Sequence, residues 1–136
     1  HWIYLTQRLF GEGHIISRQV HFPSDPGQSE FRLLAELEFG GIPAVINAAI
    51  GGAGPVGTDY TIWGTKKSLR MQSGGRISSS QGDAWLQELT NIADFTQIDI
   101  SRNIAAAAQV FRREQVKVPT LADGLAVQRI VEALIA

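Results

Sequence analysis

The chain has 136 residues, no cysteine and a formal net charge of −1, and 18 % of its residues are charged. This length fits one domain with its own core, the charge balance argues against nucleic acid as a partner, and the lack of cysteine excludes disulfides and cysteine-ligated zinc. The charged fraction lies below the value of about 25 % that is usual for soluble domains, so part of the surface is expected to be buried against a partner.

No apolar run approaches the ~20 residues of a membrane span, and no signal peptide is visible. We therefore expect no contact with a membrane and a cytoplasmic location. The sequence begins with His1 and not with methionine, inside what reads as a helix. We expect the chain to be a part excised from a longer protein.

The first expected element is a short amphipathic helix, in which Trp2, Leu5 and Leu9 share one face. A strand is expected over residues 14–22, although Arg18 interrupts its alternation of apolar and polar side chains. The apolar face of this strand is expected to hold Ile16, Val20 and Phe22.

The stretch over residues 31–72 is expected to form consecutive strands around which the rest of the chain is organised. Over residues 31–39, apolar side chains alternate with mostly charged ones, which is the period of a half-buried strand. A second strand over residues 43–50 and a hairpin over residues 60–71 follow, with a glycine-rich loop at residues 51–57 between them. The short links between these strands imply antiparallel pairing.

Helices are expected in the last part of the chain, after a short strand over residues 76–79. One helix is predicted to begin at Asp83, and Trp85, Leu89 and Ile92 would share its face. A clearer helix has Asp99 near its start and Arg112 and Arg113 near its end, and the last helix begins at Thr120, which forms a capping-box-like pair with Asp123. These elements predict an α+β fold with a single open, mostly antiparallel sheet and helices packed on one face.

Few residues of the sequence indicate a catalytic, metal-binding or cofactor-binding site by themselves. The glycine-rich loop invites a phosphate-binding interpretation, but a dinucleotide fingerprint needs a helix after it, and here Pro55 and a further strand follow. We expect this loop to be a flexible connection between strands. His1, His14 and His21 have no partner at a metal-ligand spacing, so no metal site is expected. No residue of the chain is expected to bind a cofactor.

Three stretches resemble the Gfo/Idh/MocA oxidoreductases, in the order in which that family has them. His-Trp-Ile-Tyr-Leu at residues 1–5 resembles the family's His-x-x-Asp helix, which ends in a stop like the Leu-Phe-Gly at residues 9–11. Ile-Trp-Gly-Thr-Lys-Lys-Ser-Leu-Arg at residues 62–70 resembles its Gly-Thr-x-Gly-x-Leu turn, and residues 119–133 resemble its terminal helix.

The resemblance implies that residues 1–136 form the substrate-binding and oligomerisation domain at the C-terminal end of such an enzyme. Full-length members also have an N-terminal Rossmann domain, absent from this chain, which binds NAD or NADP. The resemblance thus implies a cofactor in the full-length parent and none bound to this chain alone. It also implies a homo-oligomer, because the bare face of the family's sheet commonly stacks on another subunit.

The resemblance assigns a catalytic role to His1, which would exchange a proton with a substrate hydroxyl while hydride moves to or from nicotinamide. Tyr4 would bind the substrate from the same side of the helix, since positions i and i+3 are neighbours. Sugars, polyols and related hydroxy compounds are the substrates implied. Tyr4 stands where the family has aspartate, and a phenol is no carboxylate at neutral pH. Lys67 stands where the turn usually has glycine.

Two hypotheses therefore remain open. The ordered stretches favour a domain of an NAD(P)-dependent oxidoreductase, whereas Tyr4 favours a non-catalytic binding or assembly module built on the same sheet. The substrate and the choice between NAD and NADP also stay open.

Overall fold

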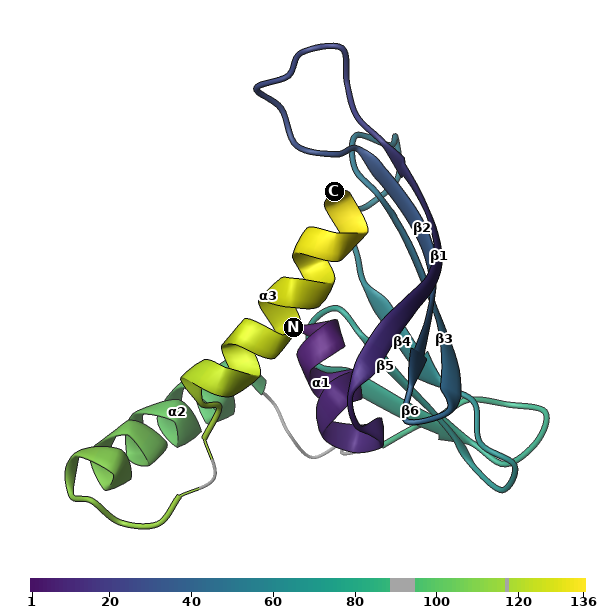
Figure 1. The fold of residues 1–136 in the computed structure, drawn as a ribbon. Helices are drawn as coiled ribbons and strands as arrows, with labels where there is room; N and C mark the ends of the chain where they lie inside the picture. Colours follow the sequence, from purple (N-terminus) through teal and green to yellow (C-terminus); the bar gives the residue numbers. More distant parts are fainter. Residues whose placement is uncertain (89–94, 117) are drawn as a thin grey trace. The chain divides into compact units, whose positions relative to one another are not determined.

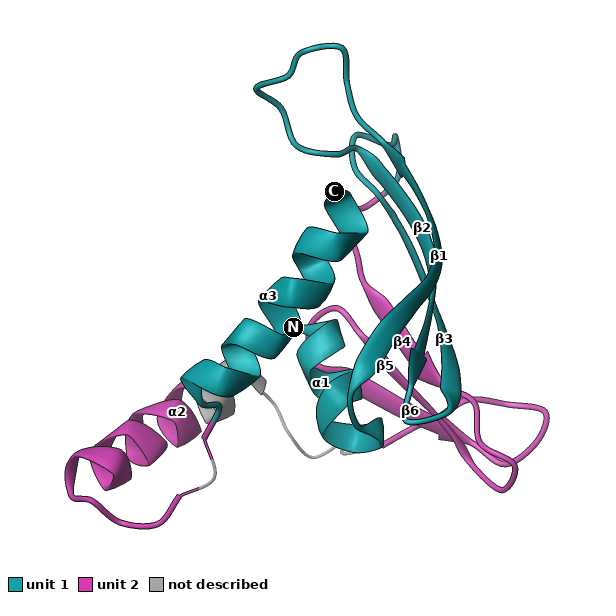
Figure 2. Ribbon diagram, in the orientation of Figure 1, with its two compact units in different colours: residues 1–54, 119–136 teal, residues 55–118 magenta. Residues whose placement is uncertain are grey.

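The computed structural model describes residues 1–88, 95–116 and 118–136, and the chain divides into two compact units (Figure 2). Unit 1 consists of residues 1–54 and 119–136, and unit 2 of residues 55–118. Each unit is described by itself. In chain order the elements are α1 (Trp2–Phe10), β1 (Gly13–His21), β2 (Arg32–Phe39), β3 (Ile42–Ala49), β4 (Asp59–Ile62), β5 (Ser68–Gln72), β6 (Arg76–Ser80), β7 (Leu86–Gln87), α2 (Phe95–Phe111) and α3 (Leu121–Ile135).

Unit 1 is a three-stranded antiparallel sheet in the order β1-β2-β3, and α1 and α3 lie on the same side of it (Figure 1). The period-two alternation of β2 turns Ala35, Leu37 and Phe39 toward the helices, where they are buried. They form the core together with Ile130 and Leu134 of α3, which are one helical turn apart and share a face.

The start of α3 confirms the predicted capping box. The hydroxyl of Thr120 accepts a hydrogen bond from the backbone N–H of Asp123 at 3.2 Å, and the Asp123 carboxylate accepts one from the backbone N–H of Thr120 at 2.7 Å. The second of these bonds is the main reason why the pKa of Asp123 lies below its ordinary value. This cap begins the helix at the point where the chain returns to unit 1.

The predicted faces of the first strand were wrong at Ile16, where β1 contains a bulge, and are confirmed from Ser17 onward. The register shifts between Ile15 and Ser17, so that Ile16 is the extra residue and 58 % of it is exposed. The bulge brings Arg18 opposite Ala35, on the face that the helices cover. There the Arg18 guanidinium donates a hydrogen bond to the carbonyl oxygen of Ala133 in α3. The charge that interrupted the sequence pattern thus ties β1 to α3.

Unit 2 contains a four-stranded antiparallel sheet in the order β4-β5-β6-β7 and the helix α2. The predicted hairpin and the short strand after it are confirmed as β4, β5 and β6. The helix predicted to begin at Asp83 was wrong over the residues described: Leu86 and Gln87 form β7, opposite Ser79 and Ser78. The backbone groups at the free edge of β6 pair with this segment, and these hydrogen bonds stabilise a strand more than the local sequence pattern stabilises a helix. Leu89 and Ile92 of that prediction lie outside the described residues.

The α+β class and the antiparallel pairing are confirmed, and the sheets are open. The strands are hydrogen-bonded as two sheets, however, and not as the single one expected. The glycine-rich loop, which includes Gly51 at a φ of 79° and Pro55, separates β3 from β4, and neither residue type continues a strand ladder well. No helix in the described ranges is long and apolar enough to cross a membrane.

We predict that Gly40 and Gly41, in the turn between β2 and β3, differ in their tolerance of a side chain. Both have a positive φ, so alanine at either position is strained by about 1–2 kcal/mol. A Cβ on Gly40 would also overlap the carbonyl oxygen of Phe10 at the end of α1, whereas a Cβ on Gly41 meets no atom within 4 Å. Gly40→Ala should therefore lower the free energy of unfolding by about 1–3 kcal/mol more than Gly41→Ala.

Urea unfolding of the two variants side by side measures this difference, with Gly41→Ala as the matched control for the backbone strain. Equal losses would show that α1 does not hold this turn in the way described.

Candidate functional site

The two predicted site residues lie in the first turn of α1. His1 is the N-cap residue, and its carbonyl oxygen accepts a hydrogen bond from the backbone N–H of Leu5 at 3.0 Å. Its side chain makes no capping hydrogen bond and is exposed, and Tyr4 is half-buried. The helix register places both on one side of α1, and no hydrogen bond between their side chains is seen. An exposed imidazole and a phenol here can exchange a proton with a hydroxyl and orient it.

The other end of α1 is anchored. Phe10 packs against the core, and the backbone N–H of Gly40 donates a hydrogen bond to the carbonyl oxygen of Glu12 at 3.2 Å. The side chain of Thr6 is buried and donates a hydrogen bond to the carbonyl oxygen of Trp2 at 2.8 Å. The first turn of α1 therefore presents His1 from a helix that is fixed on the sheet of unit 1.

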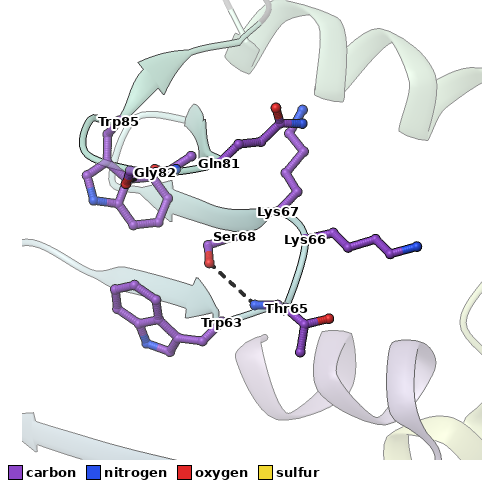
Figure 3. Close-up of a pocket in the computed structure, with 10 residues that line it drawn as sticks. Trp63, Thr65, Lys66, Lys67, Ser68, Gln81, Gly82 and Trp85 are labelled. Atoms are coloured by element: carbon purple, nitrogen blue, oxygen red, sulfur yellow. Dashed lines mark hydrogen bonds between the residues drawn. The ribbon is translucent and has the colours of Figure 1, made fainter.

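A second group of chemically interesting side chains lies in unit 2 and was not predicted. A hollow of about 210 Å³ lies at the turn between β4 and β5 and below the segment that leads into β7 (Figure 3). We call it the tryptophan hollow, and it is lined by Trp63, Gly64, Thr65, Lys66, Lys67, Ser68, Ser80, Gln81, Gly82 and Trp85.

Two indole rings form the apolar part of the tryptophan hollow. The centroids of Trp63 and Trp85 are 5.8 Å apart and the rings are inclined at 64°, which is an edge-to-face contact. The guanidinium carbon of Arg70 lies 5.9 Å from the centroid of the Trp85 ring, in the range of a cation–π contact. Trp63 is nevertheless 78 % exposed. Trp85 is thus supported on two sides, and Trp63 offers a free ring surface to solvent.

Two of the cations around the tryptophan hollow, Arg70 and Lys67, are already paired. Arg70 donates hydrogen bonds to the carboxylate of Asp59, one of them from Nε at 2.7 Å. This contact is the main reason why the pKa of Asp59 lies below its ordinary value of 3.8. The ammonium of Lys67 lies 3.0 Å from Glu88 Oε1, which also accepts a hydrogen bond from the Ser79 hydroxyl at 2.6 Å. The Ser79 hydrogen bond is the larger cause of the lowered pKa of Glu88.

The turn between β4 and β5, which lines the tryptophan hollow, has a backbone conformation that allows lysine where the resemblance leads one to expect glycine. Among the described residues other than glycine, only Arg113 has a positive φ, so Lys67 keeps an ordinary backbone conformation. The residue without room for a side chain is Gly64, where a Cβ would overlap the carbonyl oxygen of Lys67. The backbone N–H of Gly64 donates a hydrogen bond to the Ser68 hydroxyl at 3.4 Å. Lys67 therefore changes the chemistry of this turn and not its path.

The other two histidines lie on β1, in unit 1. His14 Nε2 lies 3.5 Å from Glu38 Oε1 across the strand pair, and the His21 ring lies 6.0 Å from the Phe31 ring. Within the described ranges, no group of three histidine, aspartate or glutamate side chains is arranged to hold a metal ion.

In comparisons with protein families, curated proteins and solved structures, this sequence has no match. The sequence contained one signal for the tryptophan hollow. Trp63 follows a strand and precedes Gly64 in a turn, and a large apolar side chain in a turn is not expected to be buried in a core. Trp85 gave no such signal because its spacing to Leu89 read as a helix.

We predict that Arg70 sets the pKa of Asp59. Arg70→Gln should raise this pKa toward its ordinary value of 3.8, because the largest stabilisation of the carboxylate is then removed. Since the pKa is lowered in the folded state, the pair supports folding above pH 3.8, and this support is lost as the pH falls through the lowered value. The effect on stability should be small because both side chains are more than a third exposed.

A carboxyl ¹³C NMR titration measures the pKa directly. Arg76→Gln is the control, since Arg76 lies opposite Gln72 on the neighbouring strand and makes no hydrogen bond to Asp59 in the structure. An unchanged titration of Asp59 in the Arg70→Gln variant would contradict the assignment.

Proposed function

We propose that this chain is the substrate-binding and oligomerisation domain of an NAD(P)-dependent oxidoreductase that acts on a sugar, a polyol or a related hydroxy compound. The supporting observation is the place of the three stretches that resemble the Gfo/Idh/MocA family. They form α1, the β4–β5 hairpin and α3, which are the kinds of element that the resemblance requires. An antiparallel sheet with two helices on one face, as in unit 1, also agrees with it.

In this proposal His1 exchanges the proton of the substrate hydroxyl that is oxidised or formed. The exposed imidazole at the start of α1 is free of a capping role, and an ordinary imidazole titrates close to neutral pH. Tyr4 orients the same hydroxyl compound by a hydrogen bond from one turn further along α1. A bound nicotinamide supplies the hydride chemistry. A dinucleotide would be held outside this chain, because the glycine-rich loop here leads into β4 and not into a helix.

The sheet of unit 1 has a second, open face that supports the assembly part of the proposal. Its side chains alternate with those of the core and are Ser17, Gln19, Arg32, Leu34, Glu36, Glu38, Val45 and Asn47. Val45 is 69 % exposed and lies directly opposite Glu36, and Leu34 is also exposed. An antiparallel sheet can face water on one side, but exposed Val and Leu on that side favour burial against a second copy. A non-catalytic assembly module is the alternative that this face favours.

We predict that His1→Ala in the full-length parent enzyme lowers kcat by about 10²–10⁴-fold, which is the usual value of general acid–base help. Tyr4→Phe should lower kcat/KM less, because it removes one hydrogen bond and keeps the ring. His14→Ala is the matched control, since His14 is also an exposed histidine of unit 1 but lies on β1 beside Glu38. Steady-state kinetics with the oxidised and reduced substrate measure these effects.

A His1→Ala enzyme with turnover within a few-fold of the parent would exclude the catalytic role. The assembly module would then be the better interpretation.

We predict that the chain self-associates through the open face of unit 1. Val45→Glu should weaken the dimer strongly, because it places a second carboxylate beside Glu36 at the centre of this face. Val56→Glu is the control: Val56 is fully exposed in the loop before β4, so this variant adds the same charge elsewhere. Sedimentation velocity over a range of concentrations measures both. A monomer at all concentrations, or equal effects of the two variants, would contradict the prediction.

A further inference from the structure

The residues of the proposed reaction leave the tryptophan hollow without a role. We propose that the tryptophan hollow binds one neutral pyranose ring, with the Trp63 indole as the surface on which the sugar stacks. The inference uses only contacts within unit 2 and does not depend on His1 or on the oxidoreductase proposal.

The size of the tryptophan hollow limits its occupant. Its volume of about 210 Å³ lies below the roughly 300–1,000 Å³ of pockets that enclose drug-sized ligands. A dinucleotide or an extended peptide segment is too large for it. One six-membered ring with its substituents is the kind of ligand that this space admits.

The lining favours a ring that is apolar on its face and polar at its edge. The negative face of an indole attracts the weakly positive C–H bonds that a pyranose presents on one side. The lining also holds hydroxyl and amide groups: Ser68 begins β5, Ser80 ends β6, and Gln81 follows Ser80. The Ser68 hydroxyl and the Gln81 amide can donate to and accept from the equatorial hydroxyls of a sugar, whereas the Ser80 hydroxyl already donates to the carbonyl oxygen of Gly82.

The electrostatics favour a neutral ligand. Lys67 is held by Glu88, and Arg70 by Asp59, so neither has its full charge available. Figure 3 shows the Lys66 side chain extending away from the two indoles. Lys66 lines the tryptophan hollow but is directed away from the indoles, so a carboxylate or phosphate stacked on Trp63 would lose water and meet only cations that are already paired, which is unfavourable.

The stacking surface is held in place before any ligand binds. Asp59 fixes Arg70, Arg70 lies over the Trp85 ring, and the Trp85 and Trp63 rings make an edge-to-face contact. A ligand that stacks on Trp63 therefore has little side-chain entropy to remove, and this lowers the cost of binding. Trp85 and Arg70 act as positioning residues, and Trp63 makes the contact.

The chain has three tryptophans, which makes the test direct. In ¹⁵N-labelled protein each indole N–H gives one signal, and Trp2, beside His1 in α1 of unit 1, reports separately on the proposed substrate site. The probes are the methyl pyranosides of glucose, galactose and mannose, with glucuronate as a charged comparison. With at least one neutral pyranoside, the Trp63 and Trp85 signals should shift together along one saturable curve with a Kd of about 1–10 mM.

Trp63→Ala should weaken this binding at least about tenfold, since stacking on one aromatic ring is worth that much in other ligands. Trp63→Phe keeps a smaller stacking ring and should weaken the binding less. If the Trp63→Ala variant does not fold, the Trp63→Phe variant is used for the test in its place. Trp2→Phe should bind as the parent does.

Either of two results would overturn the proposal: no saturable shift of the Trp63 and Trp85 signals with any of the three pyranosides, or full affinity after loss of the Trp63 ring. Tighter binding of glucuronate than of every neutral pyranoside would overturn the assignment of a neutral ligand. Loss of turnover in a His1→Ala enzyme has no bearing on these outcomes.

Discussion

Unit 1 depends on the packing of β2 against α3. Leu37, at 1 % exposure, lies between strand neighbours on both sides and under Ile130 and Leu134 of α3. The two elements are far apart in the sequence, so their contact closes a long loop, and only the apolar surface that it buries can offset that entropy. The capping box at Thr120 begins α3 at the residue where this contact requires it. Arg18 adds a polar tie between β1 and the end of the same helix.

The two units are stabilised by different interactions. Among the described residues, every fully buried apolar side chain belongs to unit 1, whereas the buried side chains of unit 2 are those of Ser78 and Ser79 on β6. Unit 2 is held by its strand ladders and by the polar pairs Asp59–Arg70 and Lys67–Glu88. Strand ladders with little apolar burial open at lower free energy than a packed core, so amide exchange should be faster in unit 2 than in β2.

The geometry of α1 connects the core of unit 1 with the proposed chemistry. The last turn of the helix is fixed by Phe10 in the core and by the close approach of Gly40 to its end. The first turn presents His1 and Tyr4 with little support from their own side chains. A proton-transferring group needs a defined position more than it needs burial, and a helix anchored at its far end provides that position.

The sequence by itself determined the elements whose residues alternate or repeat clearly: α1, the strand pairs β2–β3 and β4–β5, β6, and the capping box of α3. In each of these, neighbours in the chain are neighbours in space, so local patterning and turn chemistry are sufficient. The sequence also placed His1 and Tyr4 on one side of a helix, because the helix register alone does so.

Only the tertiary structure decided the rest. The bulge at Ile16 turns Ile15 instead of Ile16 toward the core, and a one-residue insertion leaves no mark in the composition. The segment at Trp85 leads into a strand instead of a helix because the edge of β6 was free to pair with it. The tryptophan hollow exists only when the β4–β5 turn and this segment are brought together. Contacts between residues that are distant in the sequence follow from packing and pairing, which no local pattern specifies.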